Sequence, residues 1–209
     1  MPITKANCEF EDLASPANEV PPSNPISDWL VRRRVTISLI GFGILAAINL
    51  GLLKTKPLDP LNWTNLPTVA ACLLILGGLC IRSWAAGTLH KSALVTQDGP
   101  YALVRNPLYV GSFLMMFGFC GLLRDAPSAL FVAGPMVAVY WVTTRRVEKN
   151  LAHWFADDWP PYERLVPRFI PKLYSSRMFG GWSFQQWRKN REYQAVLATL
   201  AAAIAVHFL

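Results

Sequence analysis

The sequence has few charged residues. Only 16% of its 209 residues are charged, whereas 53% are hydrophobic, and a soluble domain normally carries about a quarter charged residues. The apolar residues are gathered in long runs, and eight Trp would suit a protein with two membrane–water interfaces. The composition therefore favours a membrane protein over a soluble protein with an unusually apolar core.

Residues that bind metals or form disulfides are also few. The four cysteines have no metal-type spacing and the three histidines do not cluster: Cys8, Cys72, Cys80, Cys120, His90, His153 and His207. Three of the cysteines lie inside apolar segments, where a free thiol behaves as a small hydrophobe. We expect neither a disulfide framework nor a zinc site. We also expect no secretory signal, because the first 30 residues are polar and rich in proline.

The apolar runs predict an all-α, polytopic membrane protein with four to five transmembrane helices. The expected spans are Val35–Leu53, Thr68–Leu89, Tyr109–Leu123, Ser128–Thr144 and Tyr193–Leu209, with a tight hairpin at Arg124–Pro127. The last segment could span or pack against the others, and we favour a span. We divide the chain into a flexible polar tail (1–30), a first helix and loop (31–67), a core (68–191) and an apolar C-terminal helix (192–209).

The distribution of positive charge sets the expected orientation. The net charge is +7, but its asymmetry follows the positive-inside rule and argues against a nucleic-acid partner. With the N-terminus in the cytoplasm, only Lys54, Lys56 and Arg124 face outward, while Arg82 lies within a span. The loop at 99–111 and the basic region at 145–191 then share the cytoplasmic face, where the C-terminal helical and loop region forms a pocket. We expect these two regions to lie close together.

The loop Gly99–Gly111, GPYALVRNPLYVG, is the first candidate site. Its two prolines keep the chain turning, and Pro107 is well placed at the start of a helix. Arg105 and Asn106 then lie beside the free N–H groups of that helix, a place that suits a carboxylate or phosphate. An ordinary interfacial turn, with its Arg on lipid phosphate, is the alternative.

Other polar residues allow two interpretations each. Arg82 is either functional or a snorkelling side chain. Arg145 and Glu148 are three residues apart on a predicted helix and are expected to form an ion pair. Gly111 and Gly118 share a helix face, which favours close helix packing. Four tryptophans are expected at the headgroup level: Trp154, Trp159, Trp182 and Trp187.

Two stretches resemble one family. GPYALVRNPLYVG and VEKNLAHWFADDWPPYERLVPRFIP, in this order across a short hairpin, are similar to the motifs of the isoprenylcysteine carboxyl methyltransferases and the related phospholipid methyltransferases. The resemblance implies an integral membrane methyltransferase of the inner or cell membrane that uses S-adenosylmethionine at the cytoplasmic face. Its acceptor would be a membrane lipid or a prenylated molecule or protein.

The resemblance also implies the site residues. Those expected to bind the cofactor are Tyr101, Arg105, Asn106, Pro107, Tyr109, Gly111 and Glu148. Those expected to take part in catalysis are Glu148, Arg168 and Arg145. In these roles Arg105 would hold the carboxylate of the cofactor, and Arg168 would orient an acceptor carboxylate.

The chain departs from the family pattern at three positions. Asn106 stands where His is usual, Val147 replaces the first of two acidic residues, and Ala156 replaces a Gly. Because Asn cannot titrate near neutral pH, and an acceptor carboxylate needs no base, carboxyl O-methylation is favoured over phospholipid N-methylation. A reductase related to the sterol reductases and a scaffold with a degenerate site are the other hypotheses.

Overall fold

The computed structural model describes residues 25–90 and 94–209, so most of the predicted tail (1–30) lies outside the described residues. Within the described residues there are helices and turns but no strand, and the all-α class is confirmed. The helices are α2 (Pro25–Gly51), α3 (Leu66–Thr88), η2 (Gly99–Ala102), α4 (Pro107–Leu123), α5 (Ala126–Phe131), η3 (Val132–Met136), α6 (Val137–Trp154), α7 (Trp159–Leu165), α8 (Phe184–Lys189) and α9 (Glu192–His207).

Two helices of the described chain are long and apolar enough to cross a membrane. One is α3, and the other is the continuous helix Ala126–Trp154 formed by α5, η3 and α6. Shorter apolar helices cover Ile40–Gly51 and Pro107–Leu123. The long helix passes through Pro135 by way of a π-helical turn, η3, which accommodates the missing proline N–H. It extends ten residues beyond the predicted end at Thr144, so it includes Glu148.

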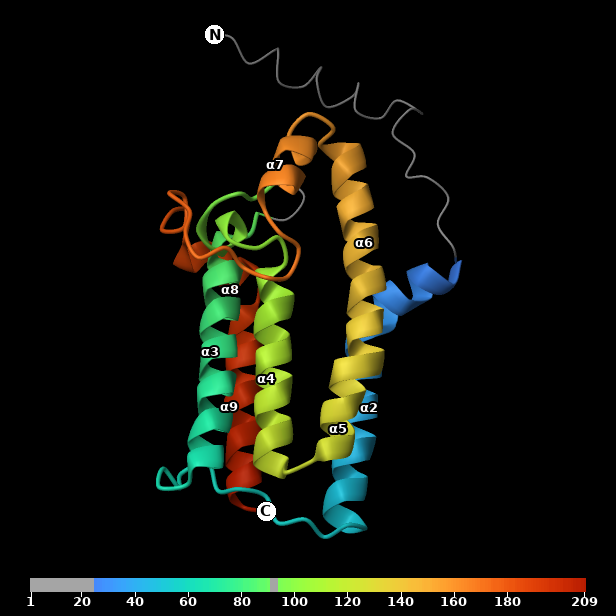
Figure 1. Cartoon of the computed structure of the whole chain (residues 1–209), viewed down its shortest axis with the longest axis vertical. Helices are drawn as coiled ribbons and strands as arrows, with labels where there is room; N and C mark the ends of the chain where they lie inside the picture. The colour runs from blue at the N-terminus through green and yellow to red at the C-terminus, as the bar shows by residue number, and fades with distance from the viewer. Residues whose placement is uncertain (1–24, 91–93) are drawn as a thin grey trace.

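Helices α3, α4 and α9 lie side by side, and α2 pairs with the α5–α6 helix (Figure 1). Glycines bring α3 and α4 together, because a Cβ on Gly111 would lie 2.6 Å from the Gly78 carbonyl oxygen. A Cβ on Gly118 would lie 2.8 Å from the Ala71 carbonyl oxygen. The predicted close packing at Gly111 and Gly118 is therefore confirmed.

The end of the bundle opposite α7 is joined by hydrogen bonds between distant segments. The Asn49 side chain donates to the Leu123 carbonyl at 3.0 Å, and the Leu58 N–H donates to the Leu122 carbonyl at 2.7 Å. Arg124 takes a left-handed conformation with φ of 52°, and Asp125 accepts a hydrogen bond from the Ser128 N–H at 3.0 Å. These contacts form the predicted hairpin between α4 and α5.

Arg82 lies within the bundle and is fully engaged. Its Nε lies 2.9 Å from Glu192 Oε1 and its Nη2 lies 3.0 Å from Glu192 Oε2, while Nη1 donates to Ser112 Oγ at 2.5 Å. This two-point ion pair joins α3, α4 and the start of α9. Neither a functional nor a snorkelling Arg82 was expected to pair with Glu192, because no spacing in the sequence links the two residues.

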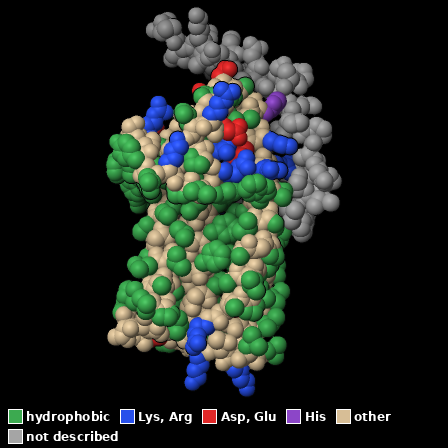
Figure 2. Space-filling model, viewed as in Figure 1, with side chains coloured by type: hydrophobic (Ala, Val, Ile, Leu, Met, Phe, Trp, Pro, Cys, Tyr) green, Lys and Arg blue, Asp and Glu red, His purple; other side chains and the backbone are tan. Residues whose placement is uncertain are grey.

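The surface separates into layers. Hydrophobic side chains cover the middle of the bundle, Lys, Arg and acidic side chains gather around the end that carries α7, and a few Lys or Arg side chains lie at the opposite end (Figure 2). An apolar middle between two charged ends is typical of a membrane protein.

Candidate functional site

The two predicted motif segments lie against each other, as the sequence predicts. The Arg105 N–H donates to the Pro167 carbonyl at 2.9 Å, and the Lys172 N–H donates to the Leu103 carbonyl at 3.0 Å. The Asn106 side-chain amide donates to the Arg168 carbonyl at 3.3 Å. Backbone groups of the loop before α4 thus find their partners in the segment after α7, about sixty residues further along the chain.

Local residues explain why the loop folds this way. Gly99 has a φ of +60°, and a Cβ there would lie 2.8 Å from Thr88 Oγ1, so the position requires glycine. Pro107 begins α4, as predicted. Asn106 precedes the helix but makes no side-chain cap, because its amide is turned toward Arg168. The loop is therefore held by its partner segment rather than by the helix it starts.

A tyrosine hydroxyl adds a buried link between the segments. Tyr162 on α7 donates its hydroxyl to the Tyr101 carbonyl oxygen at 2.9 Å. Burial raises the pKa of both phenols. Both tyrosines therefore stay neutral and protonated at physiological pH, and Tyr162 acts as a hydrogen-bond donor rather than as a base.

Four charged side chains form one network at this junction. Arg168 Nη2 lies 2.6 Å and Arg168 Nε 2.9 Å from Glu148 Oε2. Arg105 Nη1 lies 2.7 Å from Glu163 Oε1 and 3.4 Å from Glu148 Oε1. The Glu148 side chain is only 7% exposed, and a buried carboxylate needs such partners. Hydrogen bonding to Arg105 lowers the pKa of Glu163, and hydrogen bonding to Glu148 raises the pKa of Arg168.

Arg145 does not make the predicted ion pair with Glu148. Its guanidinium lies 5.1 Å from the centre of the Trp141 ring, and that of Arg168 lies at the same distance from this ring. Glu148 is paired instead with Arg168, which arrives from a segment distant in sequence. The helical spacing of Arg145 and Glu148 is correct, but the carboxylate turns to the side where a two-pronged partner lies. Arg145 lines a smaller cavity of about 350 Å³ that also borders Glu148 and Arg168.

A larger cavity of about 490 Å³ lies beside the network. It is bounded by the segment before η2, the loop, the first turn of α4, and helices α6 and α7. Six of the seven predicted cofactor-binding residues line it: Tyr101, Arg105, Asn106, Pro107, Tyr109 and Glu148. The seventh, Gly111, packs against Gly78 and does not line this cavity. Of the predicted catalytic residues, Arg168 and Arg145 lie behind Glu148, on the smaller cavity.

Several residues of the cavity wall carry no signal in the sequence. His90, Thr96 and Asn150 line the cavity, and no spacing singled them out. Trp154 lies on it as well, three residues after Leu151 and four after Asn150 on the same helix, so these three side chains share one helix face. Trp159 was expected at the headgroup level. That expectation is wrong, because Trp159 is 3% exposed and packs with Val95, Tyr162 and Val166.

The cavity suits S-adenosylmethionine in size and chemistry. Its volume lies within the roughly 300–1,000 Å³ of small-molecule pockets. Aromatic rings and the Glu148 carboxylate are the groups that favour a sulfonium cation. Arg105 Nε is buried and has no hydrogen-bond partner within the described part of the chain, so a donor remains for a carboxylate. Among the described residues, no group of three or more His, Cys, Asp or Glu side chains could hold a metal ion.

Comparison with known proteins supports the family resemblance found in the sequence. Residues 66–155 match the phospholipid methyltransferase family. The matched region runs from the start of α3 to the end of α6 and so includes the loop and Glu148. The resemblance found in the sequence is thereby confirmed.

Three relatives can be named. A nickel-cobalt-cadmium resistance protein of Alcaligenes xylosoxydans xylosoxydans is 25% identical over 158 residues, which cover 72% of this chain and 70% of that protein. A cobalt-zinc-cadmium resistance protein of Cupriavidus metallidurans is 25% identical over 172 residues, 81% of this chain and 78% of that protein. The protein-S-isoprenylcysteine O-methyltransferase of Schizosaccharomyces pombe is 30% identical over 100 residues, 48% of this chain and 42% of that enzyme. No solved structure matches the chain.

Proposed function

We propose that this protein is an integral membrane methyltransferase that uses S-adenosylmethionine to methylate a lipidic or prenylated acceptor, as isoprenylcysteine carboxyl methyltransferases do. The single observation that carries the proposal is the junction of the two motif segments around one cavity. Arg105 and Asn106 from the first segment bond directly to Pro167 and Arg168 from the second. A methyltransferase of the matched family would bind its cofactor at such a junction.

The proposal places the cavity at the cytoplasmic face of the inner or cell membrane. Helices α2, α4 and α9 would cross together with α3 and the α5–α6 helix, giving five spans. Their short apolar segments would be helped by local thinning of the bilayer and by flanking aromatic residues. The excess of Lys and Arg at the α7 end supports this orientation.

The cofactor would supply an activated methyl group on a positively charged sulfur. The free Nε of Arg105 would hold the carboxylate of its amino-acid part, and Asn106 or Glu148 would accept from its ammonium group. Tyr109, Trp154 and Glu148 would face the positive charge. Because the network already balances two acids with two arginines, the site can hold a zwitterionic amino-acid group without leaving a buried charge unpaired.

The acceptor favoured by the residues is a carboxylate. Methyl transfer needs the acceptor oxygen held in line with the sulfur–methyl bond, so positioning does most of the work. An ionised carboxylate can attack without losing a proton, whereas an ethanolamine ammonium must first lose one. Asn106 cannot take that proton, and Tyr101 and Tyr162 stay protonated. Arg168 is already engaged with Glu148 through Nε and Nη2, so in this proposal it positions Glu148 and offers only its remaining Nη1 to an acceptor.

Methyl-labelled cofactor tests the proposal and separates its alternatives. Membranes that contain the protein should transfer label into an organic-extractable product, and mild alkali should release that label as volatile methanol from a methyl ester. Alkali-stable label would indicate the phospholipid N-methyltransferase alternative. No transfer, together with no binding of S-adenosylhomocysteine by the purified protein, would favour a non-catalytic scaffold.

A further inference from the structure

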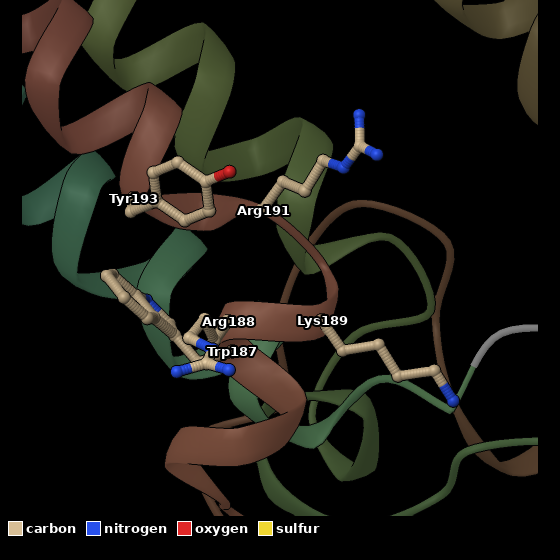
Figure 3. A pocket seen from close by; sticks show the side chains of 5 residues that line it. All are labelled: Trp187, Arg188, Lys189, Arg191 and Tyr193. Carbon is tan, nitrogen blue, oxygen red and sulfur yellow. The ribbon is translucent and has the colours of Figure 1, made fainter.

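A third cavity, of about 570 Å³, lies where α8 meets α9 and shares no lining residue with the two cavities described above. It is lined by Trp187, Arg188, Lys189, Arg191 and Tyr193. These side chains come from the end of α8, the connection to α9 and the first turn of α9 (Figure 3). Two aromatic residues and three cations thus line one hollow, which we name the α8–α9 corner.

The corner is fixed by hydrogen bonds to the end of α3. The side chain of Asn190 donates to the carbonyls of Ala86 at 2.7 Å and Leu89 at 2.9 Å, and Gln186 also donates to Leu89. These amides satisfy carbonyls that the end of a helix leaves without partners. On the other side, Glu192 is held by Arg82. The cations between Gln186 and Glu192 therefore project from a backbone that is pinned on both sides.

The cations of the corner have no acidic counterpart. Residues 164–191 contain no Asp or Glu but seven cations: Arg164, Arg168, Lys172, Arg177, Arg188, Lys189 and Arg191. Arg188, Lys189 and Arg191 are exposed, and no ion pair in the described part of the chain involves them. Three positive charges within four residues repel one another unless an anion lies among them.

The same segment exposes large apolar side chains. Ile170, Leu173, Tyr174, Phe179 and Phe184 are each more than half exposed. Apolar and aromatic side chains interleaved with Lys and Arg are typical of segments that lie at the headgroup level of a bilayer, with rings in the interface and cations on phosphates. Trp187 and Tyr193 of the corner are less exposed, and they too alternate with cations along the chain.

We propose that the α8–α9 corner binds the headgroup phosphate of an anionic phospholipid from the adjacent leaflet. Arg188, Lys189 and Arg191 would surround the phosphate, while Trp187 and Tyr193 would contact the glycerol region. Charge complementarity selects an anionic lipid over a zwitterionic one, because a zwitterionic headgroup brings its own cation into an already positive hollow. The inference uses the membrane placement proposed above but not methyl transfer.

The test measures which lipid the full-length protein retains. The protein is placed in nanodiscs of phosphatidylcholine with a minor fraction of phosphatidylglycerol, released, and examined by native mass spectrometry for bound lipid. We expect phosphatidylglycerol to be enriched over its share in the disc. The enrichment should be at least about tenfold lower in the triple variant Arg188→Gln, Lys189→Gln, Arg191→Gln. The double variant Arg188→Lys, Arg191→Lys should retain most of it.

A matched control removes three cations from the other end of the bundle. Lys54→Gln, Lys56→Gln, Arg124→Gln changes the net charge equally, and Lys54 and Arg124 have a positive φ as Arg191 does. This variant should keep the wild-type enrichment. Equal retention of both lipids by the wild type, or an equal loss in both triple variants, would overturn the proposal. Binding of inorganic phosphate to the purified protein, with no enrichment of phosphatidylglycerol over phosphatidylcholine, would also overturn it in favour of a soluble anion. No methyl donor enters the assay, so its failure would leave the proposed enzyme activity intact.

Discussion

Arg168 and Glu148 are joined by a two-pronged ion pair, with Arg168 Nη2 2.6 Å and Nε 2.9 Å from Glu148 Oε2. Glu148 comes from the helix that follows the α4–α5 hairpin, and Arg168 comes from the proline-rich segment after α7. The pair therefore fixes the second motif onto the helix that forms one wall of the cavity lined by Arg105 and Asn106. Arg105 reaches the same carboxylate from the first motif.

Glu148→Gln removes the charge that both arginines share while keeping the size of the side chain. We expect methyl transfer to fall by about 100-fold and the free energy of unfolding to fall by about 1–3 kcal/mol, since Arg168 is partly exposed and screened. Labelled-methyl assays and thermal unfolding in detergent measure the two effects. Glu163→Gln is the control: its side chain is 44% exposed, so it should cost well under ~1 kcal/mol. Equal losses in both variants would contradict a special role for Glu148.

Arg105→Lys keeps the positive charge but loses the planar guanidinium group and its Nε donor. We expect the KM for the cofactor to rise by about tenfold with a smaller change in kcat, because the change removes a binding contact rather than a reacting group. Steady-state kinetics with varied cofactor measure the split. An unchanged KM would show that the unpartnered Nε does not contact the cofactor.

Gly111→Ala tests whether this glycine serves packing. Its new Cβ would lie 2.6 Å from the Gly78 carbonyl oxygen, so α3 and α4 must separate, and we expect a loss of about 1–3 kcal/mol in the free energy of unfolding. Gly77→Ala is the matched control on α3, because a Cβ there meets nothing within 4 Å. That control should be neutral or slightly stabilising. Thermal unfolding in detergent compares them, and a stable Gly111→Ala variant that loses cofactor binding would restore the predicted binding role.

The pair formed by Arg82 and Glu192 predicts a non-additive pair of substitutions. Glu192→Gln leaves Arg82 without its counter-charge in the bundle and should destabilise by about 3 kcal/mol. Adding Arg82→Met removes the stranded charge and should recover most of that loss. Thermal unfolding of both single variants and the double variant measures the coupling. Strict additivity would mean that the ion pair contributes nothing specific.

The Arg105–Glu163 contact predicts a pH dependence. The pKa of Glu163 is lowered from its ordinary value of 4.5 by its hydrogen bond to Arg105. The unfolded chain therefore takes up a proton before the folded one as the pH falls, and the contribution of the pair is complete above about pH 5 and is lost on further acidification through the lowered pKa. The stability difference between the wild type and Glu163→Gln should be constant near neutral pH and shrink in acid. A difference that grows in acid would contradict this assignment.

The sequence predicted the elements whose signals are local. Apolar runs located the helices, Pro107 located the start of α4, and Arg124–Pro127 located the hairpin. The resemblance located six residues of the cavity wall, because the two motifs carry their own spacing. The resemblance also placed Gly111 in the binding site. In the structure Gly111 packs against Gly78, and the sequence had already favoured close helix packing at Gly111.

The features that the sequence did not predict depend on contacts between distant segments of the chain. Glu192 as the partner of Arg82, Arg168 in place of Arg145 as the partner of Glu148, and the burial of Trp159 all arise from how distant segments meet. No periodicity within a helix encodes which of two nearby arginines will face a carboxylate. His90 enters the cavity from a connection whose path only the folded chain defines.

The central claim is that the two motif segments form one cofactor site, and the binding of S-adenosylhomocysteine to the purified protein tests it most directly. Isothermal titration in detergent should show one site for the wild type, at least about tenfold weaker binding for Arg105→Ala, and unchanged binding for Lys54→Gln at the far end of the bundle. A wild-type protein that does not bind, or an Arg105→Ala variant that binds as tightly as the wild type, would contradict the account.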